Sequence, residues 1–142
     1  MAGGVSGKCY CGAHSIAAGA PLSVVYCHCT DCKRWTGAPL PAFAGVSTED
    51  VRLPEGLPPR RFGTGVTRWN CEVCGSPLAA AFDYLPGQIF LPLGILDQID
   101  DLAPSHHCHG AAQAPWLHLD DDLPRSKSSG RAALNRAADP KA

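Results

Sequence analysis

The sequence predicts an all-β domain with short helical turns, and three observations support that fold class. Glycine and proline supply 15 and 13 of the 142 residues, a content that disfavours long helices and suits short strands joined by turns. Runs of β-branched and apolar residues are short and lie between turn residues. Seven of the eight cysteines stand in three tight groups, which indicates metal binding or redox chemistry rather than scattered disulfides.

The expected strands are short runs rich in β-branched or apolar residues. They are residues 22–26, 41–46, 51–53, 59–69, 78–84 and 88–91. Gly63 and Gly65 weaken the fourth run, because glycine packs no side chain in a strand. The segment Leu85-Pro86-Gly87 between the last two runs predicts a hairpin connection.

Two short helical segments are expected between the strands. Thr30-Asp31 offers an N-cap for a turn that reaches Trp35, and Gly37 would end it. Residues 96–102 would form the second segment, with Asp97 near its start.

One domain is expected over residues 1–124, followed by a basic, mobile extension over residues 125–142. Seven basic and twelve acidic residues precede Pro124, whereas five basic residues and one acidic residue follow it. Five basic charges without an interleaved aromatic residue are typical of a solvated terminus. They favour that interpretation over an arm for nucleic acid or for an acidic partner.

The sequence shows neither a secretory signal nor a membrane span. Its first residues lack a basic region followed by an apolar stretch. Residues 9–30 contain no Lys, Arg, Asp or Glu, but glycine, proline, histidine and serine interrupt them. We therefore expect a cytoplasmic protein without a membrane partner, whose cysteines stay reduced.

The three cysteine groups carry the functional argument. They are Cys9-Tyr10-Cys11, Cys27-His28-Cys29-Thr30-Asp31-Cys32 and Cys71-Glu72-Val73-Cys74. Residues i and i+2 on a strand share a face, so a C-x-C pair presents two sulfurs to one ion. A C-x-x-C followed by glycine forms a tight turn. Reduced thiolates at such spacings suit Zn²⁺, which takes about four ligands in a tetrahedron.

Seven clustered sulfurs divide into four and three, and we prefer one closed and one open zinc site. The closed, structural site would use Cys9, Cys11, Cys71 and Cys74. The open site would use Cys27, Cys29 and Cys32. Spacing alone leaves other interpretations open: one zinc shared by the second and third groups, two purely structural sites completed by a histidine or Cys108, a redox pair, or an iron–sulfur cluster.

The same three blocks resemble the glutathione-dependent formaldehyde-activating (GFA) family, which also contains the centromere-protein-V-like domains. The resemblance rests on residues 7–12, 27–39 and 71–78, with later landmarks at residues 94–97 and Pro115-Trp116. It spans roughly residues 5–124. It implies a β-tent fold, in which zinc clasps small antiparallel sheets, and the same four-plus-three division of the cysteines. It also implies that glutathione and formaldehyde combine at the three-cysteine site.

The C-terminal part departs from the family pattern. His107 falls where a family histidine lies, but Cys108 and His109 replace an apolar–aromatic pair, and Gln113 stands where a basic residue is usual. We expect this segment, with His106, to form the rim of the site, and the minority alternative makes His107 or Cys108 a displaceable fourth ligand. His28 would point away from the open site if it lies on a strand, which favours a packing or supporting role over ligation.

The leading hypothesis for function is a zinc-dependent carbon–sulfur lyase of the GFA type. A thiol held at the open zinc would add to a small aldehyde, or be released from the adduct. Because seven thiolates outweigh two Zn²⁺ ions, an anionic thiol such as glutathione needs nearby positive charge. Lys33 and Arg34, which follow Cys32, are the candidates, although both also suit a solvated surface.

The competing hypothesis is a non-catalytic module, in which zinc supports a sheet surface for a protein or nucleic-acid partner. An open zinc site in a concave pocket favours the enzyme. A second site saturated by His107 or Cys108, beside a basic tail, favours the module.

Overall fold

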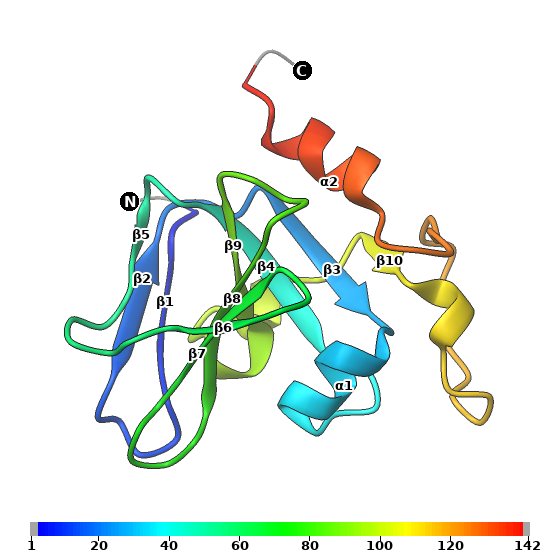
Figure 1. Cartoon of the computed structure of the whole chain (residues 1–142). Coiled ribbons are helices and arrows are strands. Elements are labelled where there is room, and N and C mark those ends of the chain that lie inside the picture. The colour runs from blue at the N-terminus through cyan, green and yellow to red at the C-terminus, as the bar shows by residue number, and fades with distance from the viewer. Residues whose placement is uncertain (1–2, 141–142) are drawn as a thin grey trace.

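The protein is described by a computed structural model over residues 3–140, and it consists mostly of short β-strands with two short α-helices (Figure 1). The strands are β1 (Val5–Lys8), β2 (Ser15–Ala18), β3 (Ser23–Cys27), β4 (Ala42–Ser47), β5 (Val51–Arg52), β6 (Arg60–Phe62), β7 (Val66–Asn70), β8 (Pro77–Phe82), β9 (Gln88–Pro92) and β10 (His106–Cys108). The α-helices are α1 (Thr30–Thr36) and α2 (Arg131–Ala138). Three single 3₁₀ turns complete the described chain: η1 (Leu93–Ile95), η2 (Ile99–Asp101) and η3 (Gly110–Ala112). The predicted β class is confirmed.

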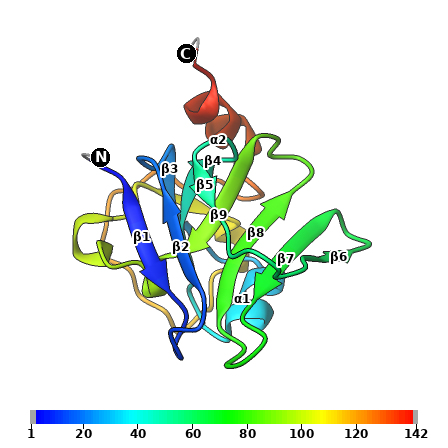
Figure 2. The same ribbon diagram turned by 90° about the vertical axis from the view of Figure 1, so that its left-hand side faces the viewer.

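The strands form two sheets. A three-stranded sheet has the order β1-β2-β5, and a seven-stranded sheet has the order β10-β3-β4-β9-β8-β7-β6. Figure 2 shows the β1–β2 pair on one side of the molecule and β6–β7 on the other. Neighbouring strands pair antiparallel except β10 and β3, which run parallel. That parallel pair places a C-terminal segment beside the second cysteine group.

Two expected elements differ from the observed ones. The run over residues 59–69 is a hairpin of β6 and β7, because Gly65 turns the chain with a positive φ of 81° and its amide donates to the Phe62 carbonyl. The helix expected over residues 96–102 is reduced to the single turn η2. Leu96 instead pairs with Gly7 and the Asp97 amide donates to the Ser6 carbonyl, so β1 takes the backbone groups that a helix would need.

Gly7 allows this close contact between β1 and the chain after η1. A Cβ atom at Gly7 would lie 2.1 Å from the carbonyl oxygen of Ile95. No side chain fits there without a backbone shift, so glycine is required at this position.

The core consists of two apolar clusters, and each contains cysteines from the predicted sites. The larger cluster includes Cys9 and Cys71 together with residues of both sheets. The smaller one surrounds Cys27 and Cys32 and includes Leu134 of α2. Each cysteine group is therefore built against packed side chains rather than on a free loop.

The C-terminal segment, expected as a mobile extension, packs against the domain in the structure. Leu134 is 5% exposed, and the Asn135 side chain donates to the Tyr84 carbonyl and accepts from Gln88. Leu134 is the buried residue of α2, and its burial supplies the apolar contact that holds this segment against the domain. Residues 141–142 of the expected extension lie outside the described residues, and the domain boundary at residue 124 stays a prediction.

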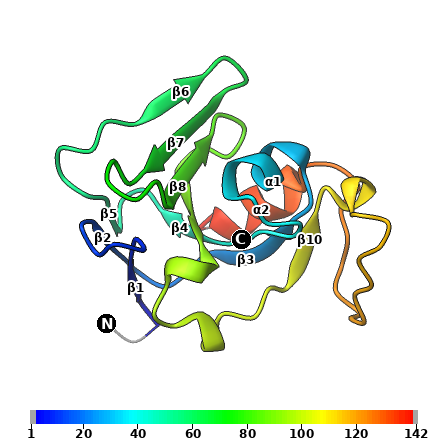
Figure 3. The ribbon, with the colours of Figure 1, turned by 90° about the horizontal axis from the view of Figure 1, so that it is seen from below.

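The two helices flank one face of β3. Figures 1 and 3 place α1 and α2 at opposite ends of the same side of this strand. The loop between β10 and α2 projects beyond them at the side of the molecule. Within residues 3–140, no helix combines the length and apolar character needed to cross a membrane.

Candidate metal centres

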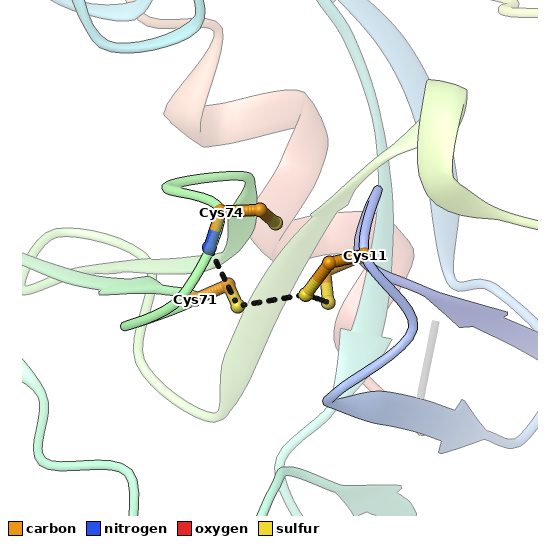
Figure 4. Close-up of side chains that lie close together, drawn as sticks. Cys11, Cys71 and Cys74 are labelled. Atoms are coloured by element: carbon orange, nitrogen blue, oxygen red, sulfur yellow. Dashed lines mark hydrogen bonds between the residues drawn. The ribbon is translucent and has the colours of Figure 1, made fainter.

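The first and third cysteine groups meet in space. The sulfurs of Cys9, Cys11, Cys71 and Cys74 all lie within 4.8 Å of one another. Figure 4 shows the sulfurs of Cys11 and Cys71 facing each other across 3.7 Å, and the sulfurs of Cys9 and Cys11 are 3.6 Å apart. The structure thus brings together the four residues predicted for the closed site.

Two glycine turns shape this cluster. Gly12, with φ 79°, follows the first pair, and its amide donates to the Cys9 carbonyl. Gly75 has the same φ and closes the other turn by donating to the Cys71 carbonyl. Both turns need a left-handed residue, which glycine adopts without steric cost. The local sequence therefore builds each half of the cluster.

Backbone amides also point at the sulfurs. The amide of His14 donates to Cys9 Sγ at 3.4 Å, and the amides of Val73 and Cys74 donate to Cys71 Sγ at 3.3 and 3.4 Å. Hydrogen bonds to sulfur favour the ionised thiolate. A thiolate is the form that ligates a metal.

The spacing of these sulfurs fits a tetrahedral zinc ion. With Zn–S bonds near 2.3 Å, tetrahedral sulfurs stand about 3.8 Å apart. A disulfide would need sulfurs about 2 Å apart, and every cysteine of the chain is a free thiol. The donor set and its dimensions therefore suit zinc.

The second cysteine group lies where β3 passes into α1. Cys27 ends β3, Cys29 is the N-cap of α1 and Cys32 lies in its first turn. The sulfurs of Cys27 and Cys29 are 3.4 Å apart, and Cys29 Sγ accepts a hydrogen bond from the Cys32 amide at 3.2 Å. The predicted helix and its end at Gly37 are observed, but the N-cap is Cys29 rather than Thr30-Asp31.

The sulfurs of the second cysteine group interact closely enough to change one another's pKa values. The hydrogen bond from Cys27 lowers the pKa of Cys29 to about 2, and the same interaction raises the pKa of Cys27. One thiolate is thus stabilised by neighbours that keep their protons. A divalent cation among these sulfurs would displace those protons and relieve the repulsion.

A small cavity adjoins the second group. It has a volume of about 30 Å³, and Cys27, Cys29 and Cys32 line it together with His109 and Cys108. Phe43, Phe82, Phe90 and Leu134 are among the remaining lining residues, which are mainly apolar. A space of this size holds about one water-sized group, so the cysteines border a small, partly open and mainly apolar pocket.

His109 is a site residue that sequence reasoning placed only at the rim. One ring nitrogen of His109 and the sulfurs of Cys27 and Cys29 all lie within 4.8 Å of one another. The parallel register pairs Cys108 with Cys27, which carries the next residue to the cysteines. No local sequence pattern predicts a parallel strand partner that lies roughly eighty residues away in the chain.

Neither of the two residues considered as a displaceable fourth ligand belongs to the group formed by Cys27, Cys29 and His109. His107 is fully buried and contacts His28 and Asp121, and Cys108 is 3% exposed on the cavity wall. His28 itself is fully buried against His107, as expected for a packing residue.

Basic side chains lie outside the cavity. Lys33 Nζ donates to the Ala112 carbonyl at 2.6 Å, and Arg34 lines a separate surface pocket of about 340 Å³. Sequence reasoning missed Arg68, which is 3% exposed, stacks 4.2 Å from the Trp35 ring centroid and donates to Asp31. Its Nη1 has no hydrogen-bond partner among the described residues.

Comparison with known proteins agrees with this geometry. The model of the glutathione-dependent formaldehyde-activating enzyme family matches residues 4–111, which include both cysteine clusters and His109. The chain belongs to this GFA family. A crystal structure of a Rhodobacter sphaeroides protein, studied as a structural genomics target, shares the fold with a TM-score of 0.54. The two chains align at 22% identity over 85% of this chain and 99% of the other. No protein of curated function matches the chain.

Proposed function

We propose that this GFA-family chain is a zinc-dependent carbon–sulfur lyase. It binds a glutathione-like thiol at the centre formed by Cys27, Cys29 and Cys32, and adds it to a small aldehyde such as formaldehyde or releases it from the adduct. The observation that carries the proposal is the small, mainly apolar pocket bordered by these three cysteines. The family match supports the same chemistry.

The proposal assigns different roles to the two cysteine clusters. Four thiolates at Cys9, Cys11, Cys71 and Cys74 complete a tetrahedron and give a structural zinc that joins β1 to the β7–β8 turn. Three thiolates at the second cluster leave a coordination position for another ligand. The protein would thus carry two zinc ions, of which the second supports chemistry.

The chemistry needs a thiolate beside an aldehyde. Zinc bound at the second centre would favour the thiolate form of an entering thiol. A new C–S bond then forms between the thiol sulfur and the carbonyl carbon, and the carbonyl oxygen takes up a proton. In the reverse direction that bond breaks, the hydroxyl proton leaves and the aldehyde is released.

The chain's own residues orient the reactants. Phe43, Phe82 and Phe90 leave room for about one water-sized group beside the sulfurs, which suits a one-carbon aldehyde. Holding the two reactants in contact supplies most of the rate enhancement. The size of the chamber therefore argues for a small aldehyde rather than a bulky one.

Lys33 and Arg34 remain the proposed contacts for a substrate carboxylate. Both stand on α1, directly after Cys32. Lys33 bonds to the segment that follows His109, whereas Arg34 lines a separate pocket and would have to turn toward the substrate. Lys33 would exchange its present hydrogen bond to Ala112 for the carboxylate. We also propose a cytoplasmic location, where the eight free cysteines stay reduced and glutathione is available.

Calorimetric titration with a panel of low-molecular-weight thiols tests the proposed function. Glutathione or a similar thiol should bind the zinc-loaded protein, and Cys32→Ser should abolish that binding. Cys108→Ser makes the same chemical change on the same cavity wall and should keep it. Absence of thiol binding, or binding indifferent to Cys32→Ser, would refute the proposed enzyme.

One observation favours a second candidate function. Because His109 lies within reach of the second cluster, the chain itself can complete that centre. A permanently completed centre would leave a non-catalytic module that binds a protein or nucleic-acid partner. Thiol binding discriminates the two, since the module would take up none.

A further inference from the structure

We infer that His109 is a fourth, chain-supplied ligand of the second metal centre, which an entering thiol must displace. The inference deepens the proposed function and rests on it. It makes the centre closed at rest and open only when a stronger ligand competes.

The placement of His109 is the first argument. A ring nitrogen of His109 lies within 4.8 Å of the sulfurs of both Cys27 and Cys29. Neutral imidazole is a common zinc ligand, and three cysteines with one histidine form a standard tetrahedral donor set. The structure therefore brings three donors together, and Cys32, whose sulfur is not within 4.8 Å of all three, would complete the set.

The neighbouring histidines are engaged elsewhere. His106 Nε2 lies 2.7 Å from Ser126 Oγ. His107 uses both ring nitrogens, one with His28 and one with Asp121. Of the three histidines in this segment, His109 is the one that the fold delivers to the cysteines.

The C-terminal segment holds His109 in place. Its amide donates to the Ser128 carbonyl at 2.7 Å, and the Gly110 amide donates to the Ser126 carbonyl at 2.8 Å. His109 adopts a left-handed backbone with φ 55°, the only non-glycine residue to do so within residues 3–140. Such a conformation is uncommon for a non-glycine residue and persists where surrounding contacts enforce it. The tail thus fixes the backbone from which the ring reaches the cysteines.

Ligand strength explains why this closure is reversible. Imidazole brings no charge, whereas a thiolate is a charged and softer donor for zinc. A substrate thiol can therefore replace His109, while water and weaker donors are kept out. His109 is half-buried at the cavity, so it can move aside without unfolding the sheet.

Cobalt substitution tests this assignment without relying on turnover. Two equivalents of Co²⁺ are loaded into the wild type, His109→Ala and His118→Ala, an exposed histidine on the loop before α2. The visible d–d bands of the second equivalent should shift in His109→Ala only, and added imidazole should restore them. Glutathione should bind His109→Ala at least tenfold more tightly than the wild type, because no internal ligand competes.

Two results would overturn the inference. If His109→Ala takes up two equivalents with an unchanged spectrum, His109 is not a ligand, although the proposed function stands. If neither protein binds a second equivalent, the inference and the proposed function fail together. Thermal unfolding of the loaded variants, compared with His118→Ala, separates a ligand effect from a folding defect.

Discussion

His28 Nε2 lies 2.8 Å from His107 Nδ1, and both side chains are completely buried. His107 Nε2 in turn lies 3.0 Å from a carboxylate oxygen of Asp121. Hydrogen bonds from the Leu123 amide and from His107 lower the pKa of Asp121 to about 2. The Asp121 carboxylate is therefore ionised near pH 7 and accepts a hydrogen bond from His107. With His107 in its neutral form, its proton then lies on Nε2, and His28 donates from its own Nε2 to His107 Nδ1.

This buried chain of side chains links β3 to β10 beside the second cysteine cluster. Burial lowers the pKa of His28 to about 4, which keeps the ring neutral near pH 7. Because His28 stands between Cys27 and Cys29, these hydrogen bonds hold the segment from the end of β3 to the start of α1 that carries both cysteines. The hydrogen bonds between His28, His107 and Asp121 therefore support the site and do not contact the substrate.

Asp121→Ala should destabilise the protein, because it leaves the buried Nε2–H of His107 without its acceptor. We expect a fall in Tm of about 3–6 °C, measured by calorimetry. Asp122→Ala, at an exposed neighbour, should leave Tm unchanged. Long-range ¹H–¹⁵N NMR should find the proton on Nε2 in both His28 and His107, and the opposite tautomer in either ring would contradict the hydrogen-bond assignment.

Cys71→Ser should impair folding, because a structural zinc contributes folding free energy directly. The variant should bind one metal equivalent instead of two and lose about 10 °C or more in Tm. Glu72→Gln alters the exposed next residue of the same turn and serves as the matched control. A Cys71→Ser protein with unaltered Tm and full metal content would show that the four-cysteine cluster is not a structural zinc site.

Gly7→Ala should cost about 3 kcal/mol of unfolding free energy, since its Cβ would collide with the Ile95 carbonyl oxygen. Gly94→Ala provides the comparison, because nothing lies within 4 Å of a Cβ there. Urea unfolding of both variants measures the difference. Equal stability of the two would mean that β1 does not approach η1 as closely as observed.

Arg68→Met should weaken metal binding at the second centre while largely preserving the packed volume. The Arg68 charge acts on Cys32 and offsets the negative charge of the three-cysteine group. We expect about tenfold lower affinity for the second equivalent, which corresponds to ~1.4 kcal/mol. Competition with a chromogenic chelator measures it, and Arg60→Met, at an exposed position on the paired strand, should have no effect. Unchanged affinity in Arg68→Met would exclude this electrostatic role.

Leu134→Asp should expose the second cysteine group, because Leu134 closes the cavity that borders these sulfurs. A carboxylate is costly to bury there, so α2 should detach. In metal-free protein, alkylation of Cys27, Cys29 and Cys32 by iodoacetamide should accelerate about tenfold, as followed by peptide mass spectrometry. Leu134→Met keeps an apolar side chain and should react at the wild-type rate. Equal rates in both variants would mean that α2 does not control access.

Much of the local structure was predictable from residue order. The turns at Gly12 and Gly75, the short helix ending at Gly37 and the β8–β9 hairpin follow from contacts within a few residues. The family was also identifiable from the three cysteine blocks, since their spacing reflects the same local turns. The prediction of a helix from Leu96 was wrong, because Gly7 of the distant strand β1 pairs with Leu96 and takes its backbone hydrogen-bonding groups.

By itself, the sequence determined the β class, the cysteine turns and the residues able to ligate a metal, because these depend on short-range geometry. Only the tertiary structure decided which partners meet across the chain. The parallel pairing of β10 with β3 brings His109 to Cys27, and burial draws Arg68 and Leu134 toward the second cluster. These long-range contacts depend on which surfaces pack together and become buried from water. They cannot be predicted from residues that are neighbours in the chain.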